Sequence, residues 1–154
     1  MTRDRTAQLV TVAVLLIAVG VGVVRKTGRR QPEQTPQDAI YSMLDAAHAG
    51  DVRAYLAHYT GPMEAALRQT LAETTAPAFA EYLKTSNAAI KGAAVSDPEK
   101  IGDHETKVRV EYIYEDRNEA QFMYLEKGPD GWKIARAESG DRIKTLIPYG
   151  TPVK

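Results

Sequence analysis

The chain has 154 residues, 20 basic and 20 acidic residues and no cysteine. This length has room for one domain with its own core, and the lack of cysteine excludes disulfides, thiolate nucleophiles and lipid attachment through cysteine. Residues 1–30 hold six basic residues and one acid, which leaves 14 basic and 19 acidic residues in 31–154, so nucleic acid, whose phosphates need basic partners, is not an expected partner.

Residues 7–24 form an uncharged, mainly apolar stretch that predicts an N-terminal transmembrane helix. As a helix this stretch rises roughly 27 Å, close to the hydrocarbon thickness of a bilayer. We therefore assign residues 1–26 to a membrane anchor and expect the membrane to be a partner through residues 7–24. Two other interpretations stay open: a signal peptide cleaved near Ala18-Val19-Gly20, where small residues suit a signal peptidase, and a buried core helix.

Basic residues flank this single-pass segment on both sides, two before it and four after it. The positive-inside rule then favours a cytoplasmic C-terminal domain, but the difference is small and short leaders break the rule. The sequence therefore does not assign the side of the membrane. Residues 27–34 offer no apolar side chain to bury and are interpreted as a solvated linker.

Four amphipathic helices are predicted after the linker. The first starts at Thr35-Pro36-Gln37-Asp38, where a capping threonine precedes a proline and an acid, and it ends at Gly50. Asp51 caps the second helix, which Gly61-Pro62 breaks, and the third runs from residue 62 to about residue 74. The fourth follows Ala76-Pro77. Each helix has one apolar face, so each is expected to pack against a sheet.

The second half of the domain alternates apolar and polar residues with a period of two, which predicts antiparallel strands. A first strand is expected within Ile90–Asp97, and three more fill residues 107–137, with turns at 116–118 and 128–131. The alternation assigns eight side chains to the face that the helices cover. They are Val108, Val110, Tyr112, Tyr114, Phe122, Tyr124, Trp132 and Ile134.

Five segments carry a resemblance to a known superfamily. They are Thr35-Pro36-Gln37-Asp38-Ala39, Ala49-Gly50-Asp51-Val52, Tyr59-Thr60-Gly61, Tyr124-Leu125-Glu126-Lys127 and Gly131-Trp132-Lys133-Ile134. In this order they resemble the nuclear-transport-factor-2-like (cystatin-like, cone-shaped) superfamily, and more closely its bacterial membrane-tethered domains of unknown function. The resemblance implies an α+β fold, with helices on one face of a curved antiparallel sheet of about four strands. It covers residues 35–138 and leaves residues 139–154 as a C-terminal tail.

The resemblance also says where chemistry would lie, because proton-transferring members of the superfamily place a carboxylate or histidine inside the cone. The predicted inner strand positions include no such group, so no catalytic residue is assigned. The three histidines share no ligand spacing, so no metal site and no cofactor is expected. Aromatic side chains and one histidine remain as candidates for lining a ligand pocket. They are Tyr41, Tyr55, His58, Tyr59, Tyr112, Tyr114, Phe122, Tyr124 and Trp132.

These features favour a membrane-tethered, non-enzymatic accessory domain that binds a small apolar ligand or a protein partner through its concave sheet. One alternative is an isomerase or dehydratase of the ketosteroid-isomerase type, using tyrosine hydroxyls with His58 or Asp45. Another is a structural oligomerisation module such as a homodimer, or a tail that docks a partner or a second copy. Core filling by the tyrosines, without any ligand, is the alternative to a pocket.

Overall fold

The computed structural model of this chain describes residues 34–144, of which the side chains of residues 143 and 144 are not described. The predicted anchor, the linker up to residue 33 and residues 145–154 of the predicted tail lie outside the described residues. No helix within residues 34–144 has the length and apolar character to cross a membrane.

Four helices come first in the described chain, as the sequence predicts. They are α2 (Pro36–Ala49), α3 (Val52–Ala57), α4 (Gly61–Glu73) and α5 (Ala76–Ala88). The start of α2 is a capping box: the Thr35 hydroxyl accepts from the Asp38 amide at 3.1 Å, and the Asp38 carboxylate accepts from the Thr35 amide at 2.9 Å. Gly50 ends α2 with a φ of 67°, a left-handed conformation that favours glycine.

Five strands follow and form one antiparallel sheet. They are β1 (Gly92–Val95), β2 (Glu99–Lys100), β3 (Glu105–Ile113), β4 (Arg117–Gly128) and β5 (Gly131–Lys144). The order is β1-β3-β4-β5, with the two-residue β2 also paired to β3. β2 was not predicted, because a strand of two residues is too short to show an alternation of apolar and polar side chains. β5 continues through Lys144, past residue 138 where the sequence placed the end of the domain.

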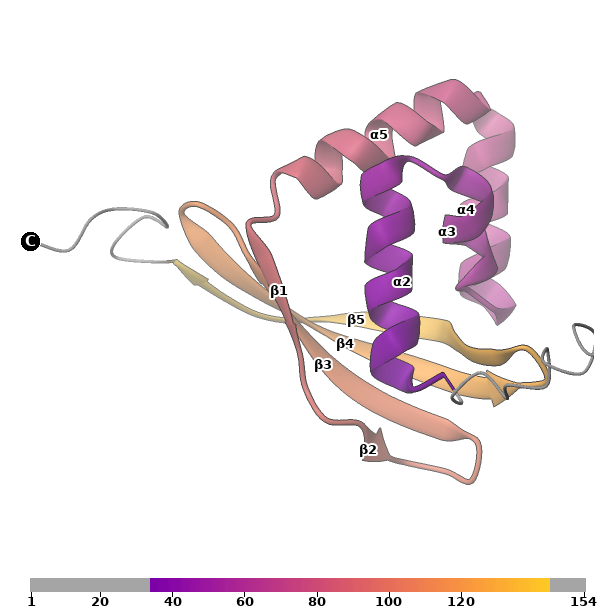
Figure 1. Cartoon of the computed structure of the whole chain (residues 1–154), viewed down its shortest axis with the longest axis vertical. Helices are drawn as coiled ribbons and strands as arrows, with labels where there is room; N and C mark the ends of the chain where they lie inside the picture. Colours follow the sequence, from indigo (N-terminus) through magenta and orange to yellow (C-terminus); the bar gives the residue numbers. More distant parts are fainter. Residues whose placement is uncertain (1–33, 145–154) are drawn as a thin grey trace, which may run out of the picture. The chain divides into compact units, whose positions relative to one another are not determined.

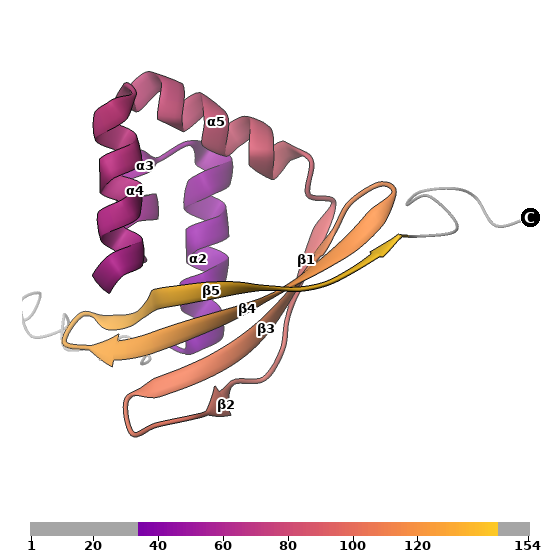
Figure 2. The same cartoon turned by 180° about the vertical axis from the view of Figure 1, so that it is seen from behind.

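The helices lie on one face of the twisted sheet, as Figures 1 and 2 show from opposite sides. α2 packs against β3 and β5, α4 packs against β5, and α5 packs chiefly on α2. Within residues 34–144 the other face of the sheet carries no helix, so we call it the open face. This α+β arrangement, with four helices against an antiparallel sheet, confirms the predicted fold class for the described part of the chain.

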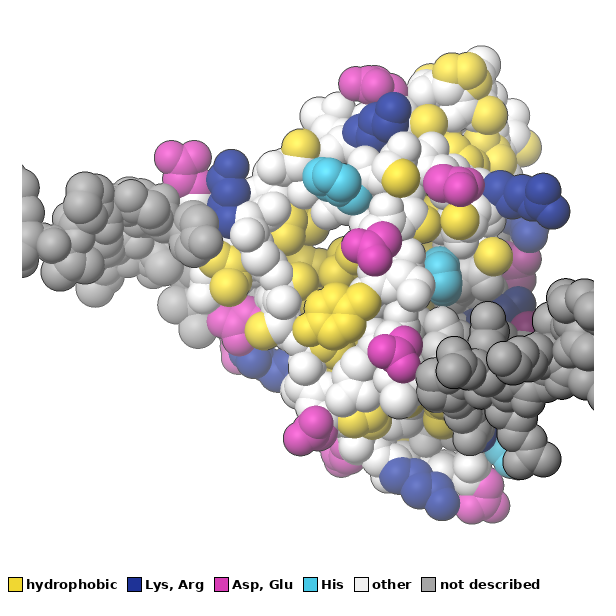
Figure 3. Space-filling view, in the orientation of Figure 1, with side chains coloured by type: hydrophobic (Ala, Val, Ile, Leu, Met, Phe, Trp, Pro, Cys, Tyr) yellow, Lys and Arg dark blue, Asp and Glu magenta, His cyan; other side chains and the backbone are white. Residues whose placement is uncertain are grey.

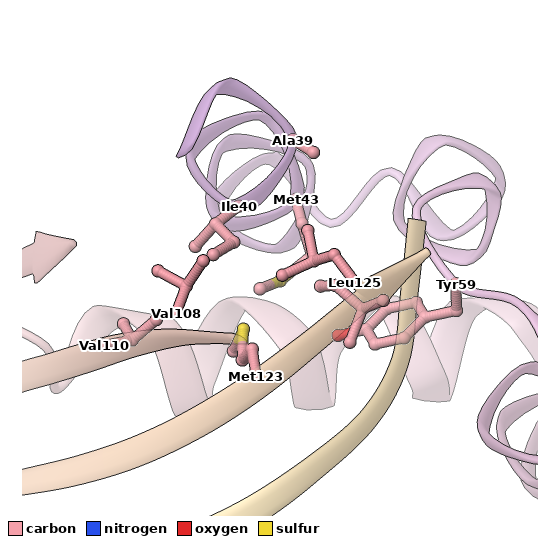
Figure 4. Packing of buried hydrophobic residues seen from close by; sticks show 9 residues of the cluster. Ala39, Ile40, Met43, Tyr59, Val108, Val110, Met123 and Leu125 are labelled. Atoms are coloured by element: carbon pink, nitrogen blue, oxygen red, sulfur yellow. The ribbon is translucent and has the colours of Figure 1, made fainter. Parts of the chain in front are cut away.

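The hydrophobic core lies between α2 and the middle of the sheet (Figure 4). Ile40 projects from α2 toward Val108 and Val110 of β3. With Leu125 of β4 and Ile134 of β5, these are the largest fully buried side chains. Burying a side chain of this size stabilises a fold by about 1.5–3 kcal/mol. Every residue of this core lies between positions 39 and 134, so the unit Gln34–Lys154 contains the core that its folding requires.

The prediction that Phe122 and Tyr124 of β4 face the helices is wrong. Phe122 pairs with Arg109 and Tyr124 pairs with Lys107, so both rings lie on the open face, whereas Met123 is buried under the helices. The sequence does not decide between the faces, because large apolar side chains occupy consecutive positions of this strand. The register with β3 decides: Met123 stands opposite Val108, whose side chain is fully buried.

Candidate functional site

A cavity of about 250 Å³ lies between the helices and the sheet. In Figure 3 hydrophobic side chains surround a hollow in the region that α2, α5 and β1 enclose in Figure 1. Its walls come from the four helices and the three long strands, together with Tyr59 beyond α3. The lining residues are Met43, Leu44, Ala47, Tyr55, Tyr59, Met63, Tyr82, Leu83, Ser86, Asn87, Ile90, Tyr112, Tyr114, Gln121, Met123 and Ala137.

Tyr55 and Tyr59 form the polar centre of this cavity. Their hydroxyl oxygens lie 2.8 Å apart in a hydrogen bond, and their ring centroids are 5.0 Å apart. Burial raises the pKa of both phenols above the ordinary value, so both are neutral at physiological pH. Two phenols that share one hydrogen bond keep one further O–H proton, which remains available to an acceptor in the cavity.

Tyr112 and Gln121 extend the polar surface along the sheet. The Tyr112 hydroxyl donates to the Gln121 side-chain oxygen at 3.4 Å, a long and therefore weak bond. Burial raises the pKa of Tyr112, and the nearby hydroxyls of Tyr114 and Tyr55 raise it further. The cavity thus presents neutral donors and acceptors and no formal charge.

The helix α5 forms one wall and is fastened to α2. The Asn87 side chain donates to the backbone oxygen of Leu44 at 2.8 Å, which satisfies a carbonyl in the last turns of α2. Leu83 is buried beside this bond, whereas Tyr82 is 65% exposed and stands at the rim. Because α5 packs chiefly on α2 and not on the sheet, space remains between α5 and the sheet.

Methionines make up much of the apolar wall. The sequence has four methionines, and the three that follow the initiator (Met43, Met63 and Met123) all line the cavity. An unbranched thioether adapts to irregular shapes, so such a wall can adjust to a ligand. Sequence reasoning overlooked these residues, although Met43 lies on the apolar face of α2 next to Ala39 and Ile40.

The structure brings together four of the nine residues that the sequence proposed for a pocket: Tyr55, Tyr59, Tyr112 and Tyr114. Tyr41 does not join them, because it lies on the outer side of α2 and is 45% exposed. Trp132 is half-buried and packs against the core without lining the cavity. Phe122 and Tyr124 lie on the open face of the sheet.

On the open face the two aromatic rings are covered by cations. Lys107 Nζ lies 4.5 Å from the centre of the Phe122 ring, and the Arg136 guanidinium lies 3.8 Å from that of Tyr124. The Tyr124 hydroxyl donates to the Glu138 carboxylate at 2.9 Å. These residues contact each other across the strands and contribute nothing to the cavity.

His58 ends α3 and also lies outside the cavity lining. Its backbone oxygen accepts from the Ile134 amide at 2.8 Å, which joins the end of α3 to the edge of β5. Burial lowers the pKa of its imidazole, and the charge of Lys133 lowers it further. The backbone of His58 therefore fastens a helix end to the sheet, and its side chain is not part of the cavity lining.

No aspartate, glutamate, histidine, lysine or arginine lines this cavity in the part of the chain that the structure describes. Asp45 is exposed on α2. Among residues 34–144 no group of three or more histidine, aspartate or glutamate side chains could hold a metal ion. The cavity can therefore enclose an apolar molecule and bind its polar atoms, but its lining supplies no general acid or base with a pKa near neutrality.

Comparison with known proteins gives likenesses in fold alone. No protein-family model matches the sequence, and no curated protein matches it. Several solved structures are similar in fold. A Shewanella oneidensis NTF-2 like protein of unknown function is 15% identical, with a TM-score of 0.44, over 70% of this chain and 100% of that chain.

Two others overlap less closely. A domain of unknown function with a cystatin-like fold from Nostoc punctiforme is 14% identical, with a TM-score of 0.37, over 70% of this chain and 74% of that chain. Bd1075 of Bdellovibrio bacteriovorus is 18% identical, with a TM-score of 0.38, over 66% of this chain and 38% of that chain. Because these overlaps are low, the α+β description of the chain rests on its own helices, strands and sheet order and not on the similar structures.

Proposed function

We propose that this chain is a membrane-tethered, non-enzymatic accessory domain that binds a small, neutral, mainly apolar ligand in the cavity between α5 and the sheet. The observation that carries the proposal is the lining, which combines methionine and leucine side chains with buried neutral phenols and no charge. The volume of about 250 Å³ exceeds the roughly 150 Å³ of an apolar cavity that binds benzene. A molecule with one ring therefore fits.

The membrane tether in this proposal rests on the sequence of residues 7–24. A small apolar molecule partitions into the hydrocarbon of a bilayer. A domain held at the membrane surface would therefore encounter such a ligand at a raised local concentration.

The isomerase alternative requires a carboxylate or an imidazole within hydrogen-bond reach of an inward tyrosine. Of the tyrosines that line the cavity, Tyr59 is bonded to the phenol of Tyr55 and Tyr112 to the amide of Gln121, and no hydrogen bond joins the Tyr114 hydroxyl to a carboxylate or imidazole among the described residues. Among the described residues, the one carboxylate with a hydrogen bond to a tyrosine is Glu138, on the open face. The geometry therefore favours binding over proton transfer.

The oligomerisation alternative has one observation in its favour, the aromatic residues of the open face. Phe122 and Tyr124 lie there without a covering helix in residues 34–144. Light scattering on the unit Gln34–Lys154 tests it. A dimer that Phe122→Glu converts to a monomer would support this function, and a monomer at all concentrations would reject it.

Native mass spectrometry of the gently purified unit Gln34–Lys154 tests ligand binding. We expect an added mass of small-molecule size that is lost when the protein is unfolded, and a rise in melting temperature with added apolar molecules. A protein that carries no added mass and shows no thermal shift across such a panel would contradict the proposal.

A matched pair of variants links any ligand to the cavity. Ala137→Leu adds volume at a lining position of β5, whereas Ala94→Leu adds the same volume at an exposed position of β1. We expect Ala137→Leu to abolish the added mass and Ala94→Leu to retain it. Equal loss in both variants would place the ligand elsewhere.

A further inference from the structure

A second cavity of about 190 Å³ adjoins the first. The two share Tyr112, Tyr114 and Gln121 in their linings, and the second adds Glu119, Ala120 and Ser139. Glu119 stands opposite Tyr112, and Ser139 stands opposite Gln121, so these residues extend along the helix-facing side of the sheet toward the β3–β4 turn. The apolar cavity therefore continues into a polar one, which we call the polar vestibule.

The charge of the polar vestibule is compensated within the protein. The Nε atoms of Arg117 and Arg142 each lie 2.8 Å from the same oxygen of Glu119, Oε1. These two guanidinium groups hold the pKa of the Glu119 carboxyl below its usual range. A ligand anion would approach a carboxylate here and a ligand cation would approach two guanidinium groups, so neither charge is favoured.

Several hydrogen-bonding atoms of the polar vestibule have no partner among the described residues. They are Glu119 Oε2, the Gln121 side-chain nitrogen, the Ser139 hydroxyl and the Tyr114 hydroxyl. The Gln121 nitrogen only donates, the Glu119 oxygen only accepts, and the two hydroxyls do both. This set is complementary to a neutral group that both donates and accepts hydrogen bonds.

We propose that the ligand is a neutral amphiphile whose ring occupies the apolar cavity and whose head group, such as a primary amide, lies in the polar vestibule. One N–H of the amide donates to Glu119 Oε2, the other N–H donates to the Ser139 hydroxyl, and the carbonyl oxygen accepts from the Gln121 side-chain nitrogen. This inference rests on the proposed function, because it names the chemical class of the ligand that the same site takes.

Four one-ring probes that differ only in the head group test this assignment. They are toluene without a polar head, benzamide with a neutral amide, benzoate with an anion and benzamidine with a cation. The dissociation constant of each is measured by NMR titration of the unit Gln34–Lys154, which contains the whole core. We expect benzamide to bind about fivefold to tenfold tighter than toluene, as one net hydrogen bond implies. Benzoate and benzamidine should bind more weakly than benzamide.

Variants assign the preference to the polar vestibule. Gln121→Leu removes the amide donor at similar volume, and we expect it to reduce the preference for benzamide over toluene to about twofold or less. Gln37→Leu, at the surface of α2, is the matched control and should leave both affinities unchanged. Ser139→Ala, at an exposed strand position, repeats the test without altering the core and should weaken benzamide alone by about twofold to threefold.

The outcomes separate this inference from the proposed function. If toluene binds and benzamide binds no tighter, the head-group assignment is wrong and the apolar site stands. A charged probe that binds tightest would also overturn the assignment of a neutral head. If no probe binds at all, both the inference and the proposed function fail.

Discussion

The buried phenol of Tyr59 depends on a single neighbour. Tyr59 is 3% exposed, and its hydroxyl bonds only to that of Tyr55 among the described residues. We expect Tyr59→Phe to lower the free energy of unfolding by about 1 kcal/mol, because the change leaves one buried hydroxyl without a partner. Tyr41→Phe is the control and should change it by less than about 0.5 kcal/mol, since Tyr41 is 45% exposed. Equal effects in urea denaturation would show that the pair stabilises nothing.

The same phenols predict the response to alkaline pH. Burial raises the folded-state pKa of Tyr55, Tyr59 and Tyr112 above the ordinary value of 10.0. Above pH 10 the unfolded chain therefore releases phenol protons that the folded chain keeps, and the free energy of unfolding falls as the pH rises.

The expected slope is about 1.4 kcal/mol per pH unit for each such phenol. Urea denaturation at several pH values above 10 measures it, and Tyr59→Phe should make the decline less steep. A slope that this variant leaves unchanged would mean that Tyr59 ionises normally in the folded protein.

At the scale of elements, two helix starts offer a matched comparison. Thr35 caps α2 through its side chain, whereas Thr60 precedes α4 without a side-chain capping bond. We expect Thr35→Ala to destabilise the domain by about 1 kcal/mol and Thr60→Ala to have little effect. Thermal or urea unfolding of both variants measures this, and a larger loss for Thr60→Ala would contradict the assignment of the caps.

The two faces of β4 lead to a second comparison. Met123 is 3% exposed under the helices, whereas Phe122 lies on the open face against Lys107. We expect Met123→Ala to cost about 2–5 kcal/mol of stability, the range for truncating a buried side chain of this size. Phe122→Ala should lower the stability by clearly less, about 1 kcal/mol, since the contact of its ring with Lys107 is a cation–π interaction at an exposed site. If urea denaturation showed the larger loss of stability for Phe122→Ala, Phe122 and not Met123 would lie under the helices, as the alternation predicted.

These elements also show what the sequence can and cannot predict. The start and end of α2 were predictable, because Thr35, Pro36 and Gly50 act locally and each has a specific backbone role. The face of β4 was not predictable, because Phe122, Met123, Tyr124 and Leu125 give both faces large apolar side chains. Pairing with β3 settles the question, and pairing is a long-range property.

The cavity was predictable only in part. Tyr55 and Tyr59 share a helical face by spacing, and Tyr112 and Tyr114 share a strand face, so their convergence follows from local patterns. The empty space depends on how α5 lies on α2, which the Asn87–Leu44 hydrogen bond fixes across 43 residues of sequence. No local sequence pattern encodes this long-range contact. Two bulges in β5 also shape the cavity, because they place Ala137 opposite Met123.

For the whole molecule, the proposed membrane tether makes a separate prediction. We expect the full chain to stay in the membrane fraction after extraction at high pH, and the unit Gln34–Lys154 to be released. Mass spectrometry of the mature chain distinguishes a retained leader from a cleaved signal peptide. A full-length chain found in the supernatant would contradict the tether.

The central claim, that the cavity receives a small apolar molecule, is tested most directly by NMR of methionine methyl groups. In the unit Gln34–Lys154 the methionines are Met43, Met63 and Met123, and all three line the cavity. On titration with toluene we expect all three methyl signals to shift along a common saturable curve, and Ala137→Leu to suppress those shifts. Methyl signals that stay unchanged up to the solubility limit of toluene would contradict the account.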